Sequence, residues 1–224
     1  MKKAVDILMI LITFLILFSH SIYAQTGDDL KAKIDGLVLK HYFDGIQYTE
    51  ANALGPNAVP YLLELLNNPN IKEYWVNIIV TLGFIESSTA LNPLISFLEN
   101  SRGEVDISNY RALMSVPFAI GCIASNGDPK AFNYLIGKVY TPSPVRWSFR
   151  GKNINRILAE KSIRGLAISG QARARAEILK LKGEIERKKG PTEREVLIKS
   201  IKNGLDIMDR IKNKGRSTIF NPQK

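Results

Sequence analysis

The chain has 224 residues and a formal net charge of +10, and 45% of its residues are hydrophobic. Its one cysteine, Cys122, excludes an internal disulfide, and one of its two histidines lies within the first 24 residues. With His41 as the remaining histidine, the sequence excludes a zinc site made of cysteine and histidine and argues against a Ser-His or Cys-His nucleophile.

The first 24 residues resemble a signal peptide. Lys2 and Lys3 form a basic start, residues 7–18 form an apolar core, and Ala24 ends a small-residue exit, so we predict cleavage after Ala24. The apolar core of about a dozen residues is shorter than the roughly 20 that span a bilayer. We therefore expect a periplasmic or extracellular protein without a transmembrane helix after cleavage. An uncleaved anchor is the alternative.

Residues 25–49 are predicted to form an N-terminal leader and a first helix. Asp28 and Asp29 make the start of this segment soluble. His41 stands beside Tyr42 and a phenylalanine, and we expect it to be a partly buried packing residue rather than a catalytic one.

A short phrase with an alanine and, four residues later, a leucine or isoleucine recurs within residues 50–189. The alanines are separated by 32, 41 and 43 residues, which is the spacing of two-helix units that stack into a solenoid. These alanines are Ala58, Ala90, Ala131 and Ala174. The sequence therefore predicts an all-α repeat domain over residues 50–189.

The unit around the second alanine is the clearest. Apolar residues at helical spacing predict a helix over residues 73–84 and a second helix over residues 89–99, with Thr89 as its N-cap. Gly83 lies near the end of the first helix, and Ala167 occupies the corresponding place two units later. We expect these small residues to let the two helices of one hairpin approach closely.

Residues 74–83 followed by residues 90–94 resemble the HEAT repeat family, especially the short bacterial HEAT-like repeats also found in phycobilisome lyase-type proteins. The resemblance covers roughly residues 54–183. It implies an α-solenoid of stacked antiparallel helix pairs, about four units, with a C-terminal capping helix. Proteins of this family mostly act as binding surfaces and share no catalytic residue set. The spacings of 41 and 43 residues depart from the short pattern and require longer helices or inserted loops.

Two breaks interrupt the later units. Residues 126–129 (Asn-Gly-Asp-Pro) predict a turn in which glycine takes a positive φ, Asp128 caps the next helix and Pro129 suits its first turn. Residues 141–152 are predicted to be an inserted loop, because two prolines break any helix there.

The last segment, residues 190–224, is predicted to contain the capping helix of the stack. A capping-box spacing over residues 192–195 starts it, an apolar stripe from Leu197 to Ile211 follows, and Gly215 ends it. We expect residues 216–224 to be frayed.

Positive charge is concentrated near the C-terminus. Residues 25–144 contain 8 Lys/Arg against 12 Asp/Glu, whereas residues 145–224 contain 21 against 8. This excess favours an anionic partner. The candidate surface combines guanidinium or ammonium groups with two aromatic rings: Arg146, Trp147, Phe149, Arg150, Lys152, Arg156, Arg164, Arg173 and Arg175. In the alternative interpretation, these residues are ordinary solvated side chains and Trp147 holds the loop against the core.

Glu99, Glu104 and Asp106 form the best candidate for paired catalytic carboxylates. Because they flank a short polar segment, we interpret them as part of a solvated connection between units. We predict no catalytic residues, no metal site and no cofactor.

The sequence therefore predicts an exported, non-catalytic scaffold that binds another protein in the cell envelope. Binding of anionic lipid or envelope polysaccharide through the basic C-terminal half is the first alternative, and a hydrolytic enzyme is the second. The export signal argues against nucleic acid as the partner.

Overall fold

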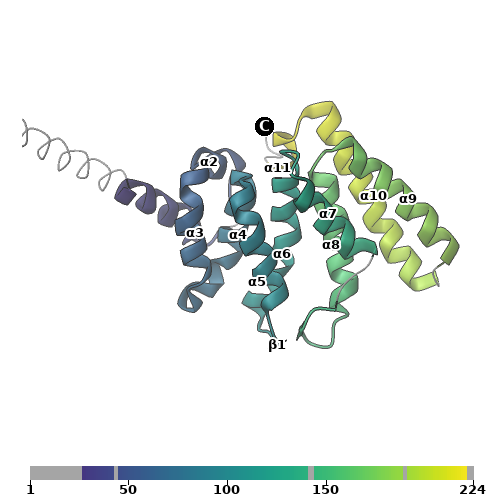
Figure 1. Cartoon of the computed structure of the whole chain (residues 1–224), viewed down its shortest axis with the longest axis horizontal. Coiled ribbons are helices and arrows are strands. Elements are labelled where there is room, and N and C mark those ends of the chain that lie inside the picture. The colour runs from purple at the N-terminus through teal and green to yellow at the C-terminus, as the bar shows by residue number, and fades with distance from the viewer. Residues whose placement is uncertain (1–26, 43–44, 141–143, 189–190, 221–224) are drawn as a thin grey trace, which may run out of the picture.

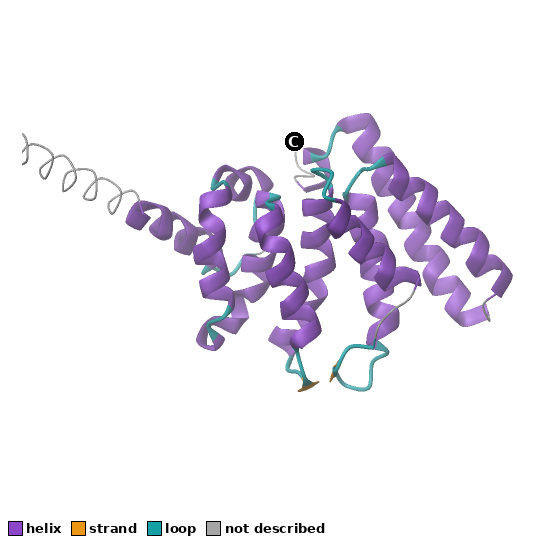
Figure 2. Cartoon of the chain, viewed as in Figure 1, coloured by secondary structure: helices purple, strands orange, loops and turns teal. Residues whose placement is uncertain are grey.

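The computed structural model describes residues 27–42, 45–140, 144–188 and 191–220, and this part of the chain is mostly helical (Figures 1 and 2). The predicted signal peptide, the start of the predicted inserted loop at 141–143 and the last four residues of the predicted frayed tail lie outside the described residues. Within the described residues, no helix combines the length and apolar character needed to cross a membrane.

The first helix of the described chain covers residues 27–38. The α-helices that follow are α2 (Tyr48–Ala53), α3 (Val59–Leu66), α4 (Trp75–Ile85), α5 (Leu91–Asn100), α6 (Ile107–Ala124), α7 (Pro129–Tyr140), α8 (Ile154–Ile168), α9 (Ala172–Lys188), α10 (Pro191–Lys214) and α11 (Ser217–Phe220). Short 3-10 turns are η1 (Pro56–Ala58), η2 (Pro69–Tyr74) and η3 (Ser88–Ala90), and the strands are β1 (Gly103–Glu104) and β2 (Trp147–Ser148).

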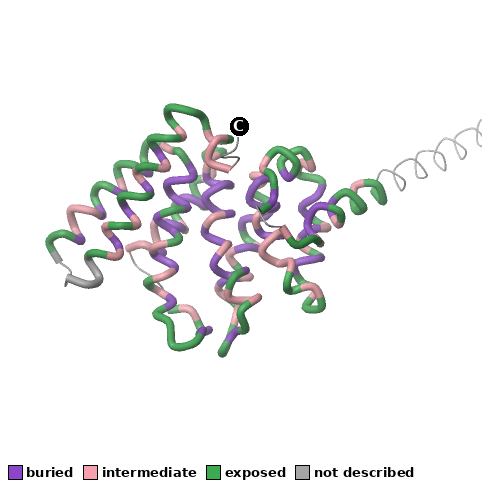
Figure 3. Tube along the Cα trace, turned by 180° about the vertical axis from the view of Figure 1, so that it is seen from behind, coloured by how far each residue is buried: buried purple, intermediate pink, exposed green. Residues whose placement is uncertain are grey.

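The helices form two rows that follow the long axis of the molecule (Figure 1). In the first row, α2, α4, α6, α8 and α10 each contact the next helix of the row. In the second row, α3 lies against α4, α5 against α6, α7 against α6 and α8, and α9 against α8 and α10. The core is the layer between the rows, and buried positions recur along each helix with exposed positions between them (Figure 3).

The recurring phrase marks where each second-row helix begins. All four alanines are fully buried at or near the starts of α3, α5, α7 and α9, and so are the leucine or isoleucine residues one turn later. Burying one such leucine contributes about 1.5–3 kcal/mol. The helical pattern predicted from this phrase is confirmed.

Contrary to the prediction from the sequence, the small residues near the ends of the first-row helices do not bring the two helices of one hairpin together. A side chain on Gly83 of α4 would meet Ala119 of α6, with 2.6 Å between the added Cβ and the Cα atom of Ala119. Ala167 of α8 faces Gly204 of α10. The close contacts therefore join neighbouring helices of the first row rather than the two helices of one hairpin.

The closest approach of two backbones lies between α6 and α8. A Cβ on Gly121 would lie 2.3 Å from the carbonyl oxygen of Gly165, and a Cβ on Gly165 would lie 2.4 Å from the carbonyl oxygen of Pro117. Only glycine fits both positions, since any Cβ there would overlap the facing backbone.

The spacings of 41 and 43 residues between the recurring alanines come from a longer helix and an inserted loop, as expected. α6 has 18 residues where α4 has 11, and the insertion precedes α8. Gly127 takes a φ of 86° at the predicted turn, and Asp128 accepts hydrogen bonds from the N–H groups of Lys130 at 2.9 Å and Ala131 at 3.0 Å. The predicted turn and its cap are confirmed.

The insertion pairs with the connection between α5 and α6. β2 lies parallel to β1, with Gly103 opposite Trp147. The Gly103 N–H donates to the carbonyl of Arg146, and the Val105 N–H donates to that of Ser148, both at 3.0 Å. The connection that we interpreted as solvated is therefore hydrogen-bonded to the insertion.

Two local predictions are wrong. The cap before α5 is Ser87, whose hydroxyl accepts from the N–H of Thr89, because a 3-10 turn precedes the α-helix and moves the cap two residues earlier. His41 is exposed rather than partly buried, and its ring centre lies 5.2 Å from that of Tyr74.

The predicted fraying of the tail is also wrong over residues 216–220. After Gly215, which has a φ of 79°, the chain turns back and α11 lies beside α6 (Figure 1). The cause is a pair of side chains, Arg216 and Phe220, that bind to the first row.

Candidate functional site

A groove lies across the first row between α4, α6 and α8. Its floor is apolar and comes from two pairs of residues one helical turn apart, Val76 and Val80 of α4 and Met114 and Phe118 of α6. The groove has a volume of about 440 Å³. Val76, Val80 and Phe118 are partly exposed and Met114 is buried, so the floor of the groove is an apolar surface that remains partly accessible.

Three cations border this groove. Arg111 comes from α6, and Lys161 and Arg164 come from α8. A second hollow of about 380 Å³ between α8 and α10 shares Lys161 and Arg164 and adds the carboxylates Glu160 and Asp206. Among the described residues that line the two hollows, the cations therefore lie at the apolar groove and the carboxylates lie toward α10.

The two aromatic residues of the predicted anionic surface are buried. Trp147 is 4% exposed and its indole N–H donates to the carbonyl of Leu98 at 3.1 Å. Phe149 is 3% exposed and stacks on Tyr110 with ring centres 4.1 Å apart. The rings hold the insertion against α5 and α6, so the prediction that they stack on a ligand is wrong.

The cations of the insertion are exposed. Arg146, Arg150 and Lys152 are on its surface, and the guanidinium carbon of Arg150 lies 5.1 Å from the ring centre of Phe149. Arg150 has a φ of 45°, and its N–H donates to Glu104 at 2.6 Å. The insertion thus presents positive charge without an exposed ring.

The cations of the predicted surface on α8 and α9 point toward different neighbours. Arg156 pairs with a carboxylate one turn along α8 at 3.5 Å. Arg173 lies over the ring of Phe132 of α7 at 3.7 Å, and Arg175 pairs with Asp209 of α10 at 2.7 Å. The nine predicted residues therefore do not converge on one surface.

Arg164 is the predicted residue that reaches the groove, and sequence reasoning missed Arg111 and Lys161. The sequence contains a pattern that points to this groove. Val76 with Val80 and Met114 with Phe118 are apolar pairs at a spacing of four, adjacent to the main stripe and therefore a second apolar face on each helix. Cations next to such a face could have been selected as candidates.

The candidate catalytic carboxylates stabilise the fold. Glu104 accepts hydrogen bonds from the Ser148 hydroxyl at 2.5 Å and the Arg150 N–H at 2.6 Å, and these bonds lower the pKa of Glu104. Glu99 pairs with Lys138 at 2.7 Å and accepts a hydrogen bond from the hydroxyl of Tyr134. A general acid at Glu104 would require the opposite, a raised pKa.

Asp106 is the N-cap of α6. Its carboxylate accepts from the N–H of Asn109 at 2.9 Å and pairs with Lys72 at 2.5 Å, and the ammonium group is the largest cause of its lowered pKa. Within the described residues, no group of His, Cys, Asp and Glu is arranged to hold a metal ion.

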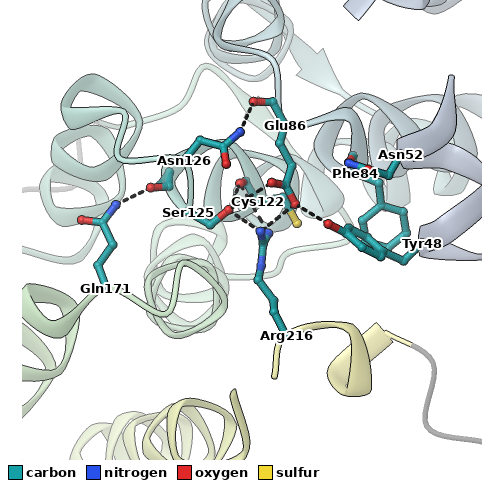
Figure 4. Close-up of polar contacts among 10 residues, drawn as sticks. Tyr48, Asn52, Phe84, Glu86, Cys122, Ser125, Asn126, Gln171 and Arg216 are labelled. Carbon is teal, nitrogen blue, oxygen red and sulfur yellow. Dashed lines mark hydrogen bonds and ion pairs between the residues drawn. The ribbon is translucent and has the colours of Figure 1, made fainter. Parts of the chain in front are cut away.

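The C-terminal segment binds the first row through a guanidinium group (Figure 4). Arg216 donates to Glu86 at 2.6 Å, to the hydroxyl of Ser125 and to the carbonyl of Cys122 at 3.4 Å. The side chains of Arg216 and Glu86 are 18% and 8% exposed, so this ion pair is largely removed from water. The thiol of Cys122 is buried, which raises its pKa to about 12.

Phe220 completes this attachment. Its ring centre lies 4.9 Å from that of Phe84, 5.3 Å from that of Tyr48 and 5.7 Å from that of Phe118. The three rings belong to α4, α2 and α6. Phe118 therefore contacts the tail and also lines the groove.

Comparison with known proteins gives no relative: no protein-family model matches the chain, and no curated protein or solved structure has significant similarity to it.

Proposed function

We propose that the protein is an exported HEAT-like α-solenoid that binds a protein partner in the cell envelope through the groove between α4, α6 and α8. The helix contacts support the architecture. α3 packs on α4, α5 on α6, α7 on α6 and α8, and α9 on α8 and α10, and α10 covers the end of the first row. The buried alanine phrase stands at or near the start of each of these four second-row helices.

The observation that carries the proposal is the combination of a partly accessible apolar floor with three cations at its edge. An amphipathic segment would place apolar side chains on Val76, Val80, Met114 and Phe118. Charge complementarity makes that segment acidic, because carboxylates on its flank would pair with Arg111, Lys161 and Arg164. The volume of the groove suits a few side chains of a helix or loop rather than a whole domain.

A photo-crosslinking residue in the groove tests the proposal. Placed at Ser115 of α6, it should cross-link in envelope extract to one acidic, amphipathic segment of a partner, identified by mass spectrometry. Placed at Asn133 of α7, in the second row, it should not react with that segment. Equal labelling from both positions would refute the groove as the binding site.

Charge reversal gives a matched pair of variants. Lys161→Glu should abolish retention of that partner, because the partner's carboxylates would face a like charge in the groove. Arg187→Glu, an equal change at an exposed position of α9, should leave retention unchanged. Partner binding that survives Lys161→Glu would contradict an acidic occupant.

Exposed cations on the insertion support a second candidate, binding to anionic lipid or polysaccharide. Arg146, Arg150 and Lys152 lie together in sequence and are exposed. Sedimentation with vesicles containing anionic lipid would then decrease steeply as salt rises from about 0.1 M to 1 M, where the Debye length falls from about 10 Å to 3 Å. Unchanged sedimentation after all three are replaced by glutamine would eliminate this candidate.

The proposal that the protein is exported rests on the signal-peptide pattern of residues 1–24. N-terminal sequencing of the protein recovered from cells should find Gln25 as the first residue.

A further inference from the structure

The residues that hold the chain's C-terminal segment have the properties of a peptide-binding site. We call this site the C-terminal seat and define it as Glu86, the Ser125 hydroxyl and the Cys122 carbonyl on the polar side, and the rings of Tyr48, Phe84 and Phe118 on the apolar side. We infer that the seat recognises a segment with an arginine and, four residues later, a phenylalanine, and that a partner protein carrying such a segment can replace the chain's own. This inference does not rest on the proposed function, although Phe118 belongs to both the seat and the groove between α4, α6 and α8.

The polar side of the seat is organised by groups other than the tail. Glu86 ends α4 with a φ of 61°, and its carbonyl accepts from the side-chain amide of Asn126 at 3.1 Å. The hydroxyl of Tyr48 donates to the carboxylate of Glu86 at 3.1 Å. These bonds come from the first row and do not need Arg216. An open seat would therefore keep the Glu86 carboxylate in position without its cation partner, which favours uptake of another guanidinium.

The apolar side is equally independent of the tail. Phe84 contacts Tyr48 edge-on at 5.2 Å and Phe118 edge-on at 5.5 Å, so the three rings form a cluster without Phe220. A fourth aromatic ring adds favourable edge-to-face and stacked contacts beyond the apolar area that it buries. The seat thus offers one charged and one aromatic contact on one face.

The spacing of the two anchors matches one helical turn. Arg216 immediately precedes α11 and Phe220 is its last residue, and the guanidinium carbon of Arg216 lies 5.5 Å from the ring centre of Phe220, so the two side chains lie on the same side of the segment. Recognition through such pairs is common when a short helix binds a groove.

The tail has little else to hold it. α11 is four residues long, and each of its residues is at least partly exposed. A helix of this length is not stable alone. Gly215, with its φ of 79°, turns the chain after α10 and separates that helix from α11. The tail can therefore leave the seat without disturbing α10.

A labelled peptide with the sequence of residues 214–220 tests the inference. The receptor is the full chain with Arg216→Ala and Phe220→Ala, which keeps every seat residue and removes both anchors of the tail. Fluorescence anisotropy should show saturable binding to this variant and at least tenfold weaker binding to the wild-type chain. The wild-type tail competes because a short linker holds it at an effective concentration on the order of 1 mM.

Variant peptides test the chemistry of recognition. Replacing the peptide's arginine or phenylalanine by alanine should weaken binding at least tenfold, whereas replacing the serine that corresponds to exposed Ser217 should not. Glu86→Gln in the receptor should weaken binding of the unchanged peptide as much as replacing the peptide's arginine does. Lys161→Glu, in the groove, should leave peptide binding unchanged, which separates this site from the proposed partner groove.

Hydrogen exchange on the wild-type chain gives a test that does not rely on a variant. Saturating unlabelled peptide should raise the exchange rate of the amides of α11, because the chain's own tail is displaced. Unchanged exchange with peptide in the millimolar range would overturn the inference. So would a double variant that has the wild-type circular dichroism spectrum but binds no peptide.

Discussion

Replacing Gly121 by alanine should destabilise the protein more than a typical surface change. The new Cβ would lie 2.3 Å from the carbonyl oxygen of Gly165 and 2.7 Å from its Cα atom, whereas ordinary contacts begin at 3.4 Å. α6 and α8 would have to separate by roughly 1 Å, and such overpacking costs about 1–3 kcal/mol or more. The higher helix propensity of alanine offsets up to about 1 kcal/mol of this destabilisation. We therefore expect a net loss of roughly 2 kcal/mol.

Thermal denaturation followed by circular dichroism measures this loss. For a chain of this length, about 2 kcal/mol corresponds to a decrease in Tm of about 4–8 °C. Gly183→Ala is the matched control, since its new Cβ would meet only the flexible end of Arg187, at 3.9 Å, and should raise Tm slightly. If Gly121→Ala were as stable as Gly183→Ala, the backbones of α6 and α8 would not be in contact at Gly121.

Two further substitutions and one labelling experiment test the contacts around α5 and α6. Asp106→Ala should cost about 0.5–2 kcal/mol at pH 7 through loss of the N-cap. The pKa of Asp106 is below its ordinary value of 3.8. The stability that the charged carboxylate contributes is therefore fully present above pH 3.8 and is lost as the pH falls through the lowered pKa. Urea titrations at pH 7 and pH 3 should show the gap between variant and wild type shrink in acid. Trp147→Phe should lose roughly 1–3 kcal/mol, measured by the same titration, because the buried carbonyl of Leu98 loses its donor. Cys122, with a pKa of about 12, should not react with a thiol reagent at pH 8 until denaturant unfolds the chain; rapid reaction of the native protein would contradict its burial.

Local patterns predict the helices well. The helix expected over residues 73–84 is α4, and that over residues 89–99 is α5. The stripe from Leu197 to Ile211 lies in α10, as predicted, although nothing is described of the side chains of the capping box at 192–194. These predictions succeed because apolar spacing within a few turns is a direct consequence of burying one helix face.

Contacts between distant residues could not be predicted from the sequence. Trp147 bonds to a carbonyl 49 residues away, and Arg216 pairs with Glu86 across 130 residues. The tail resembles a frayed end because its two anchors stand among polar residues without a repeating pattern. The candidate cations were chosen by their clustering in sequence, whereas the groove joins Arg111 of α6 to residues of α8. Only the arrangement of the helices brings these residues together.

The returning C-terminal segment changes how the chain can fold. A row of helices held by neighbouring contacts can lose its ends one unit at a time, so its stability is nearly a sum of local terms. Arg216 and Phe220 connect the last helix of the row to α2, α4 and α6, and opening at the C-terminal end must break these contacts as well. The ion pair of Arg216 with Glu86 joins residues 130 positions apart in the sequence. The completed structure, unlike its individual helices, therefore forms only after residues 216–220 have been synthesised.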